Sequence, residues 1–427
     1  MFFEREIPIY DFIRAISETV DHVLPVLNDH HKKVANISYR IAQEMKMPDD
    51  EIQRIVLAAI VHDIGAFSTG ERLKLLNYES FEENLDEHAM QGYGLFKGFT
   101  PLAKVAKLIQ YHHEDYDPLK RDVSLGSYVI HLADRVSVLP DAESEILGQV
   151  PDVVEKICLK KHKFHPDAFS ALGRLTKQEC FWFEVFLPSS DTSVLKSTLF
   201  SKRIIGLDIL QNFAKLIARI IDFKSRFTVT HSSGVAAVAR ELSALLGFSE
   251  RECKLMEIAG LLHDLGKLAV PNEILEKNGK LSSEEFNVIK KHTFYTYDIL
   301  SKITGMEEIA AWAAYHHERQ DGNGYPFHVK GEHFSKLARV MAVADVFTAL
   351  TEDRPYRRGM DKKETMDILF DLGDYGGIDK SVVNVAYHNY LQINEIRINA
   401  QKEERNNYAI FQRTINQYGK TEKMRTA

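Results

Sequence analysis

The strongest constraint on the fold is an internal repeat, in which histidines and aspartates return about two hundred positions later. The matching residues are His30 and His231, His62-Asp63 and His263-Asp264, His88 and His292, His112-His113 and His316-His317, and Asp134 and Asp345. The offset is 201 residues for the first two pairs, 204 for the next two and 211 for the last. An offset that grows in small steps indicates a duplicated domain with short loop insertions rather than a solenoid.

The segments between the repeated positions have the pattern of helices. Residues 252–264 carry apolar side chains at helical spacing, and Gly266 follows as a stop signal. Residues 282–285 (Ser-Ser-Glu-Glu) form a capping box for a helix that continues past His292. Ser335 is placed to cap a largely buried helix over 336–350. Strand-like alternation is scarce, so the predicted fold class is all-α, with two helical bundles in tandem.

The repeat and the composition of the connecting segments divide the chain. We predict an N-terminal domain over 1–187, a linker over 188–202 that begins with a proline and polar residues, and a C-terminal domain over 203–400. The last segment, 401–427, is polar and is predicted to be a helical tail without an assigned function.

Composition excludes several classes of function. The formal net charge is −7, so the chain lacks the basic field that binds nucleic acid polymers. Three cysteines without a CxxC spacing are typical of a reducing compartment. The N-terminus carries charges where a signal peptide needs an apolar core, and no segment is apolar enough to span a membrane. We therefore expect a cytoplasmic protein that does not bind membranes.

The C-terminal copy collects five histidines and two aspartates that together form a candidate metal site. They are His231, His263, Asp264, His292, His316, His317 and Asp345. Imidazole and carboxylate ligands suit iron, manganese, zinc or nickel better than calcium or magnesium. Because seven side chains exceed what one ion takes while leaving room for water, two ions are the simpler interpretation. Asp264 is the natural bridge, since each carboxylate oxygen can bind one ion, and such a pair can hold a hydroxide and clamp a phosphoryl group.

The adjacent histidines 316 and 317 precede an unusual loop. Neighbouring residues on an α-helix point about 100° apart, so both can reach one ion only where the helix ends or becomes irregular. The loop that follows contains Gly322 and Gly324 and closes on Pro326. This spacing predicts positive φ or a close backbone approach, followed by a rigid exit.

Three linked motifs resemble those of HD-GYP domains, a subgroup of the HD metal-dependent phosphohydrolases. The motifs are Leu262-His263-Asp264-Leu265-Gly266-Lys267, the stretch from His316 to Pro326, and Asp353-Arg354-Pro355-Tyr356-Arg357. The match covers roughly residues 200–400, and residues 1–185 resemble a plain HD domain. The resemblance implies a helical bundle around a metal centre. It also implies an enzyme, a phosphodiesterase that hydrolyses a cyclic dinucleotide to the linear dinucleotide or on to the mononucleotide.

The resemblance also implies roles for individual residues. One ion would be held by His231, His263 and Asp345, a second by His292, His316 and His317, and Asp264 would bridge the two around a hydroxide. Lys267 would contact the scissile phosphate or that hydroxide, where an ammonium offsets developing negative charge. Arg354 and Arg357 resemble the phosphate-binding arginines of the family, a task that suits a guanidinium fork.

The chain departs from the family pattern at two positions. Relatives with a third ion carry a glutamate four residues before the first histidine, where this chain has Phe227, so we predict two ions. The residue before Val235 is often arginine in the family and is Gly234 here, a difference from which we expect little consequence.

The N-terminal copy keeps a full set of ligands but lacks the other motifs. The retained residues are His30, His62, Asp63, His88, His112, His113 and Asp134. Ala66 stands at the position of Lys267, and neither the Gly-Tyr-Pro loop nor the Asp-Arg-Pro-Tyr-Arg stretch has a counterpart. We predict that this half can bind metal without catalysing hydrolysis, and that it serves as a regulatory or dimerising domain.

The predicted substrate is cyclic di-GMP, with 3′,3′-cyclic GMP-AMP a close second. The second choice arises because an HD domain before an HD-GYP domain also resembles bacterial phosphodiesterases specific for 3′,3′-cyclic GMP-AMP. The alternative is a non-catalytic cyclic-dinucleotide receptor or partner-binding signalling module, which the intact Lys267 disfavours. A general HD nucleotidase is disfavoured by the Gly-Tyr-Pro loop. In the family this loop suggests docking to diguanylate-cyclase domains, and a homodimer is compatible with the sequence.

Overall fold

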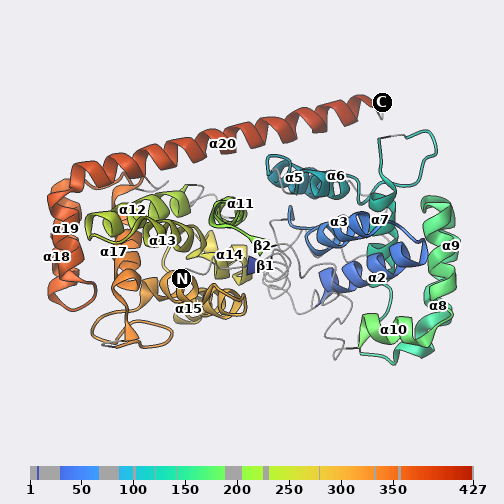
Figure 1. The fold of residues 1–427 in the computed structure, drawn as a ribbon, viewed down its shortest axis with the longest axis horizontal. Helices are drawn as coiled ribbons and strands as arrows, with labels where there is room; N and C mark the ends of the chain where they lie inside the picture. Colours follow the sequence, from blue (N-terminus) through green and yellow to red (C-terminus); the bar gives the residue numbers. More distant parts are fainter. Residues whose placement is uncertain are drawn as a thin grey trace. The chain divides into compact units, whose positions relative to one another are not determined.

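The chain was analysed as a computed structural model, which forms two compact helical units (Figure 1). The structure describes residues 7–8, 29–66, 86–99, 102–120, 122–141, 143–187, 204–224, 230–277, 279–330, 333–353 and 357–425. Within these ranges the only strands are β1 (Ile7–Pro8) and β2 (Ile204–Ile205), which pair with each other. The predicted all-α fold is confirmed.

The N-terminal unit contains the helices between residues 30 and 186. They are α2 (His30–Glu44), α3 (Asp49–Ile60), α5 (Asp86–Phe96), α6 (Ala103–Gln110), α7 (Leu125–Ser137), α8 (Ile146–Leu159), the 3₁₀ helix η3 (Lys161–Lys163), α9 (Pro166–Leu175) and α10 (Glu179–Phe186). Helix α2 packs against both α3 and α7, and α5 packs against α6. The core between them is apolar and includes Val34, Ile37, Ile55 and Leu132.

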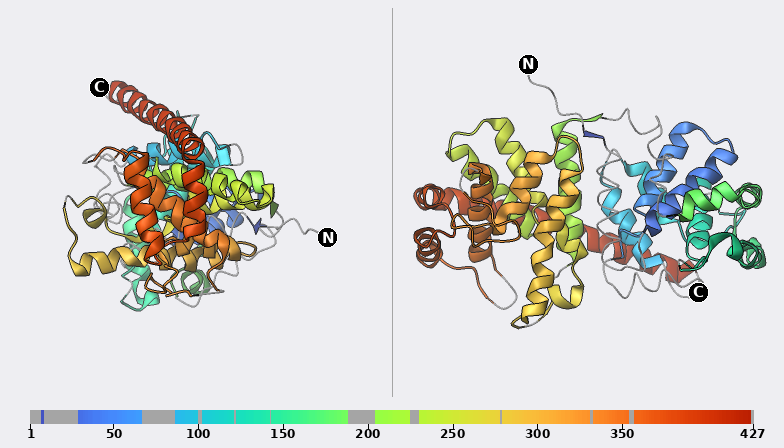
Figure 2. Two further views of the ribbon diagram at one scale, coloured as in Figure 1. Left: turned by 90° about the vertical axis from the view of Figure 1, so that its left-hand side faces the viewer. Right: turned by 90° about the horizontal axis from the view of Figure 1, so that it is seen from below.

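The C-terminal unit repeats this arrangement and extends it. Its elements are α11 (Leu207–Lys224), α12 (His231–Leu245), α13 (Glu250–Leu262), η4 (Leu265–Ala269), α14 (Asn272–Leu275), α15 (Ser283–Ser301), α16 (Glu307–Ala314), η5 (Tyr315–His317), α17 (Lys336–Thr351), α18 (Lys362–Asp374), α19 (Lys380–His388) and α20 (Tyr390–Arg425), the last of which belongs to this unit as far as Gln412. Helix α12 packs against α13 and α17, and α15 against α16, as their counterparts do in the first unit. Helices α18 and α19 lie side by side in both figures (Figures 1 and 2).

The helix starts follow the capping signals of the sequence. Ser282 accepts a hydrogen bond from the backbone N–H of Glu285 at 3.2 Å, and the Glu285 carboxylate accepts one from the backbone N–H of Ser282 at 2.7 Å. Ser335 caps α17 through the N–H of Ala338 at 3.2 Å. Both predicted caps are confirmed. They fix where α15 and α17 begin, and therefore where His292 and Asp345 lie along them.

Several predicted segments lie at the edges of what is described. The linker over 188–202 is outside the described residues, and most of the predicted tail falls within α20, which continues to Arg425. None of the described helices combines the length and the apolarity that a membrane crossing requires.

In each unit, the glycine two residues after the His-Asp pair lets another helix pack closely against this segment. A Cβ atom at Gly266 would lie 1.9 Å from the backbone oxygen of His292, and one at Gly65 would lie 2.1 Å from that of His88. A methyl group cannot fit at either distance, so glycine is required at both positions. The same close approach in both units places His292 of α15 and His88 of α5 beside their His-Asp pairs.

Replacing Gly266 with alanine should therefore displace α15 from η4. We expect Gly266→Ala to lower the free energy of unfolding by about 1–3 kcal/mol, because the clash is with backbone rather than with a flexible side chain. Gly173→Ala is the matched control, since a Cβ there meets nothing within 4 Å and helical alanine is favoured over glycine. Urea unfolding of both variants measures the difference, and equal midpoints would contradict the packing argument.

Candidate metal centre

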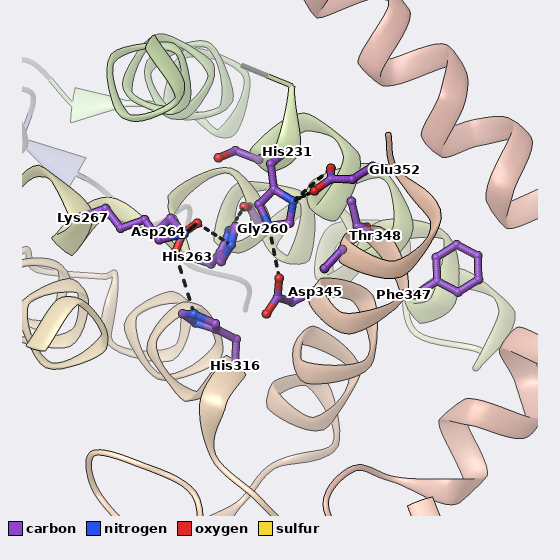
Figure 3. A network of polar contacts seen from close by, with 12 residues as sticks. His231, Gly260, His263, Asp264, Lys267, His316, Asp345, Phe347, Thr348 and Glu352 are labelled. Carbon is purple, nitrogen blue, oxygen red and sulfur yellow. Dashed lines mark hydrogen bonds and ion pairs between the residues drawn. The ribbon is translucent and has the colours of Figure 1, made fainter. Parts of the chain in front are cut away.

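The first group of candidate ligands is the His231 cluster, which comprises His231, His263, Asp264 and Asp345 (Figure 3). His231 is the first residue of α12, His263 and Asp264 follow the end of α13, and Asp345 lies in the middle of α17. The Nε2 atom of His231 is 3.2 Å from Oδ1 of Asp345, and Nε2 of His263 is 3.1 Å from Oδ2 of Asp264. The neighbouring ligands of a tetrahedral ion bonded at about 2.1 Å are roughly 3.4 Å apart, so these separations suit one ion.

The second group is the His292 cluster, formed by His292, His316 and His317. The Nε2 atoms of His292 and His316 are 3.2 Å apart. Helix α16 ends at Ala314, and both neighbouring histidines lie in the 3₁₀ helix η5. The irregularity that the sequence required for both to reach one site is therefore present.

Asp264 lies between the two clusters and offers one carboxylate oxygen to each. Its Oδ2 atom faces His263, while its Oδ1 atom lies 3.5 Å from Nε2 of His292 and 3.9 Å from Nε2 of His316. The side chain is buried, and no hydrogen-bond donor in the described part of the chain reaches Oδ1. A buried carboxylate oxygen without a donor is costly unless a cation compensates it. The donor set, imidazole with carboxylate, fits divalent transition metals.

Hydrogen bonds to the backbone orient three of the histidines. Nδ1–H of His263 donates to the carbonyl of Gly260 at 2.7 Å. The corresponding bonds are 2.6 Å from His292 to the carbonyl of Ile289, and 2.7 Å from His316 to that of Ala313. Donation from Nδ1 fixes the tautomer that leaves Nε2 as the lone-pair donor, and the Nε2 atoms point at Asp264.

His231 is oriented differently, by a carboxylate. Its Nδ1 atom lies 3.1 and 3.2 Å from the two carboxylate oxygens of Glu352, while its Nε2 atom faces Asp345 (Figure 3). A carboxylate behind a histidine raises the basicity of the ring and holds its direction, as in many metal sites. Sequence reasoning missed Glu352. A usable signal was its position seven residues after Asp345, two helical turns along α17, where side chains share a face.

The electrostatics of the two clusters differ. Burial lowers the pKa of His292 to about 3 and that of His317 to about 4, so both are neutral near pH 7, the form that binds metal. Burial also lowers the pKa of His231, but Glu352 and Asp345 more than offset this and raise it to about 10. A metal ion that binds at the His231 cluster therefore competes with a proton. Burial raises the pKa of Asp264, but the charges of His263 and Lys267 outweigh this effect and hold the pKa well below its usual value.

Lys267 contacts the bridging carboxylate directly. Its Nζ atom donates to Oδ2 of Asp264, and its side chain remains 25 % exposed. Burial lowers the pKa of Lys267, but the nearby carboxylate of Asp264 raises it above its ordinary value, so the ammonium stays charged at neutral pH. A partly exposed cation beside two ion sites is placed to meet an anionic substrate.

The loop after His317 is held by a buried carboxylate. Glu318 is 1 % exposed and accepts hydrogen bonds from the backbone N–H groups of Phe327 at 2.7 Å and Val329 at 3.1 Å. Gly322 has φ 76°, and a Cβ at Gly324 would lie 2.4 Å from a backbone nitrogen. The predicted backbone constraints are confirmed. The clamped loop places the ring of Tyr325 at 5.0 Å from that of His317.

The predicted roles of the site residues stay predictions, including those at three further positions. Arg354 and Phe227 lie outside the described residues. The guanidinium of Arg357 donates to the backbone carbonyls of Ala349 at 2.6 Å and Leu350 at 3.3 Å, near the end of α17. Arg357 thus has a structural role beside any contact with substrate, which stays a prediction.

The N-terminal unit brings its own seven predicted residues together. The His30 cluster comprises His30, His62, Asp63 and Asp134, and the His88 cluster comprises His88, His112 and His113. Separations of 3.1–3.7 Å join Nε2 of His30 and His62 to the oxygens of Asp63 and Asp134. Oδ1 of Asp63 is 3.2 Å from Nε2 of His88, so Asp63 lies between its clusters as Asp264 does.

The surroundings of these clusters differ from those in the C-terminal unit. Arg135, 1 % exposed, binds the second oxygen of Asp134 through Nε at 3.1 Å. Nδ1 of His30 faces the hydroxyl of Ser137 at 3.2 Å instead of a carboxylate. A further histidine, His31, lies with the His62-Asp63 pair and was missed by the sequence analysis. Its adjacency to His30 was the available signal.

Comparisons with known proteins agree with this geometry. Family models described as "HD domain" match residues 28–139 and 215–382. The "3'3'-cGAMP-specific phosphodiesterase 1" of Vibrio cholerae is 32 % identical over 87 % of this chain and 89 % of its own length. The chain belongs to the HD-GYP phosphodiesterase family.

Other HD-GYP phosphodiesterases match over shorter stretches or by fold. The "Cyclic di-GMP phosphodiesterase response regulator RpfG" of Xanthomonas campestris is 38 % identical over 36 % of this chain and 41 % of its own length. A crystal structure of the cyclic GMP-AMP phosphodiesterase V-cGAP3 of V. cholerae covers 89 % of this chain and 97 % of the solved one, with a TM-score of 0.60 and 20 % identity. That likeness shows that the arrangement of helices is shared.

The bridging position of Asp264 predicts unequal effects of two substitutions on metal content. Asp264→Ala should abolish tight binding at both clusters, because each loses an oxygen ligand. His292→Ala should release only the ion of the His292 cluster. Metal analysis after gel filtration measures both, with unfolding curves as the control for folding. Equal losses in the two variants would contradict the bridge.

Proposed function

We propose that the C-terminal unit binds two divalent metal ions and hydrolyses 3′,3′-cyclic GMP-AMP to the linear dinucleotide. The observation that carries this is the buried Asp264 carboxylate, which offers one oxygen to each cluster and has the ammonium of Lys267 beside it. Iron, manganese and nickel are among the ions that the donor set suits. When bound, two such ions supply Lewis acidity and an activated water for in-line attack on phosphorus.

The residues of the chain supply orientation and charge. Asp264 and the histidines would hold the two ions, and the Nδ1–H bonds keep the rings of His263, His292 and His316 in place. Lys267 offsets the negative charge that develops on the phosphate oxygens or on the leaving alkoxide. Arg354 and Arg357 are proposed to bind the flanking phosphate, for which a guanidinium fork is suited.

The preference for 3′,3′-cyclic GMP-AMP over cyclic di-GMP depends on how much of the chain each named relative matches. The V. cholerae relative that matches most of this chain is named for 3′,3′-cyclic GMP-AMP, whereas RpfG, named for cyclic di-GMP, matches about a third of it. The sequence alone placed cyclic di-GMP slightly ahead, and the full-length match now favours 3′,3′-cyclic GMP-AMP. Membership in a family of named phosphodiesterases does not favour the alternative of a non-catalytic receptor.

Turnover of the two cyclic dinucleotides at equal concentration tests the proposal. We expect hydrolysis of 3′,3′-cyclic GMP-AMP to exceed that of cyclic di-GMP in protein loaded with iron or manganese. Lys267→Met, which keeps the chain length but removes the ammonium, should lower kcat by about 10²- to 10³-fold at unchanged metal content. Absence of turnover of either compound by fully loaded wild-type protein would favour the receptor.

The N-terminal unit is proposed to bind metal without hydrolysing cyclic dinucleotides. Its two clusters have separations that suit ions, yet Ala66 stands where Lys267 stands. The buried Arg135 binds Asp134, which belongs to the His30 cluster alone, rather than Asp63, which lies between the two clusters. An arginine bound to Asp134, with alanine at the position of Lys267, suits a structural or regulatory role. Docking of diguanylate-cyclase domains and homodimerisation stay predictions.

Matched double variants separate the two units. His62→Ala with Asp63→Ala should reduce the metal content while leaving turnover within about threefold of wild type, because the C-terminal centre is intact. His263→Ala with Asp264→Ala should abolish turnover and leave the N-terminal ions in place. Metal analysis and product chromatography on both proteins provide the measurement. Hydrolysis that survives the second pair of substitutions would place catalysis in the N-terminal unit.

A further inference from the structure

A chain of buried polar side chains leads from α20 to the His231 cluster. The amide nitrogen of Gln401 donates to Oε2 of Glu352 at 3.0 Å, and Glu352 in turn holds Nδ1 of His231. The amide oxygen of Gln401 accepts a hydrogen bond from Arg397, one turn earlier on α20. The match to the HD-domain model ends at residue 382, so both α20 residues lie beyond that match.

The hydrogen-bond donors and acceptors in this row of side chains can be arranged in one way only. Arginine has no acceptor, so Gln401 must turn its oxygen toward Arg397 and its NH₂ group toward Glu352. Arg397 is itself held by the side-chain oxygen of Asn394, at 3.0 Å from Nε and 2.8 Å from Nη2. Arg397, Gln401 and Glu352 are 5 %, 4 % and 6 % exposed. Without water to replace them, these bonds fix the direction of the Glu352 carboxylate.

Separate contacts dock α20 against the unit. Arg219 of α11 binds both carboxylate oxygens of Glu404, at 2.6 and 3.1 Å. The ring of Tyr390 lies 5.5 Å from that of Phe347 on α17. Gln401 therefore sits in a docked segment of the helix, and its amide is not needed to attach α20.

Gly234 leaves the space that Gln401 occupies. A Cβ at Gly234 would lie 2.8 Å from the amide nitrogen of Gln401 and 2.9 Å from a methyl carbon of Thr348. Any larger side chain on this turn of α12 would push the amide away from Glu352. The sequence analysis expected little consequence from glycine here, whereas in the structure it makes room for the contact.

We propose that α20 is part of the metal centre and that Gln401 is a positioning residue for the ion of the His231 cluster. It acts through Glu352, whose carboxylate sets the direction and basicity of the His231 ring. The inference rests on the proposed binding of two ions in the C-terminal unit. It assigns to a helix beyond the HD-domain match a role in how tightly one of those ions is held.

Metal retention against a chelator tests this role. In Gln401→Leu, the ion of the His231 cluster should be released at about tenfold lower chelator concentration, while the other ion of the same unit is unchanged. The test is made with manganese in the His62→Ala, Asp63→Ala background, so that ions of the N-terminal unit contribute less to the measured metal content. Lys402→Ala, an exposed neighbour on α20, is the control. Glu404→Gln loosens the docking contact and should lower the unfolding temperature of the metal-free protein without selective release of one ion.

Gly234→Ala provides a second route that leaves Gln401 in the chain. It should cause the same selective release, and its effect should not add to that of Gln401→Leu, because both remove one contact. Retention in Gln401→Leu equal to that of Lys402→Ala, or fully additive effects, would overturn the inference while the metal centre stands. Failure of the wild-type unit to bind manganese, iron or nickel would instead overturn the proposed function, and the inference with it.

Discussion

The structure of each unit depends on one buried carboxylate shared between two sets of histidines. Asp264 and Asp63 each turn one oxygen toward the cluster formed with the first histidine of the unit and the other toward a second cluster. A charge this deeply buried is costly, so the surrounding helices must meet at one point with their donors facing inward. That requirement explains why the duplication keeps the candidate ligands at matching positions in both units.

Much of the fold and most of the site could be predicted because their signals are local or repeated. The capping serines, the glycines and the His-Asp pairs each act within a few residues, and the recurrence of each ligand at a nearly constant offset separated ligands from incidental histidines. Glu352 and Gln401 could not be found in this way. Their roles arise from contacts across 121 and 49 residues, and a glutamate or glutamine on a helix carries no distinctive chemistry until its partner is known. Arg357 differs from both: its motif suggested a substrate contact, which stays a prediction, and the structure adds a bond to backbone that the motif did not indicate.

In each unit a cation contacts a buried aspartate, but the aspartate differs, and this difference bears on the chemistry of the units. Lys267 contacts the bridging carboxylate and remains partly exposed, so its charge can move toward a substrate. Arg135 is fully buried against the carboxylate of Asp134 and cannot move toward a substrate in this way. Either cation compensates buried negative charge. Only the first is positioned where phosphoryl transfer develops more of it. We propose that this difference lets one set of candidate ligands serve hydrolysis and the other a structural or regulatory role.

The row of polar side chains through Gln401 also extends the proposed functional domain to include α20. Because metal ions bind the folded state and not the unfolded chain, every contact that strengthens their binding also stabilises the fold. With the proposed ion bound at the His231 cluster, a helix that orients Glu352 would therefore contribute to stability twice: directly through its docking contacts such as Arg219 with Glu404, and indirectly through that ion. The indirect contribution vanishes when the ions are removed. Metal-loaded and metal-free protein should consequently differ in how strongly they depend on α20, although the docking contacts are the same in both.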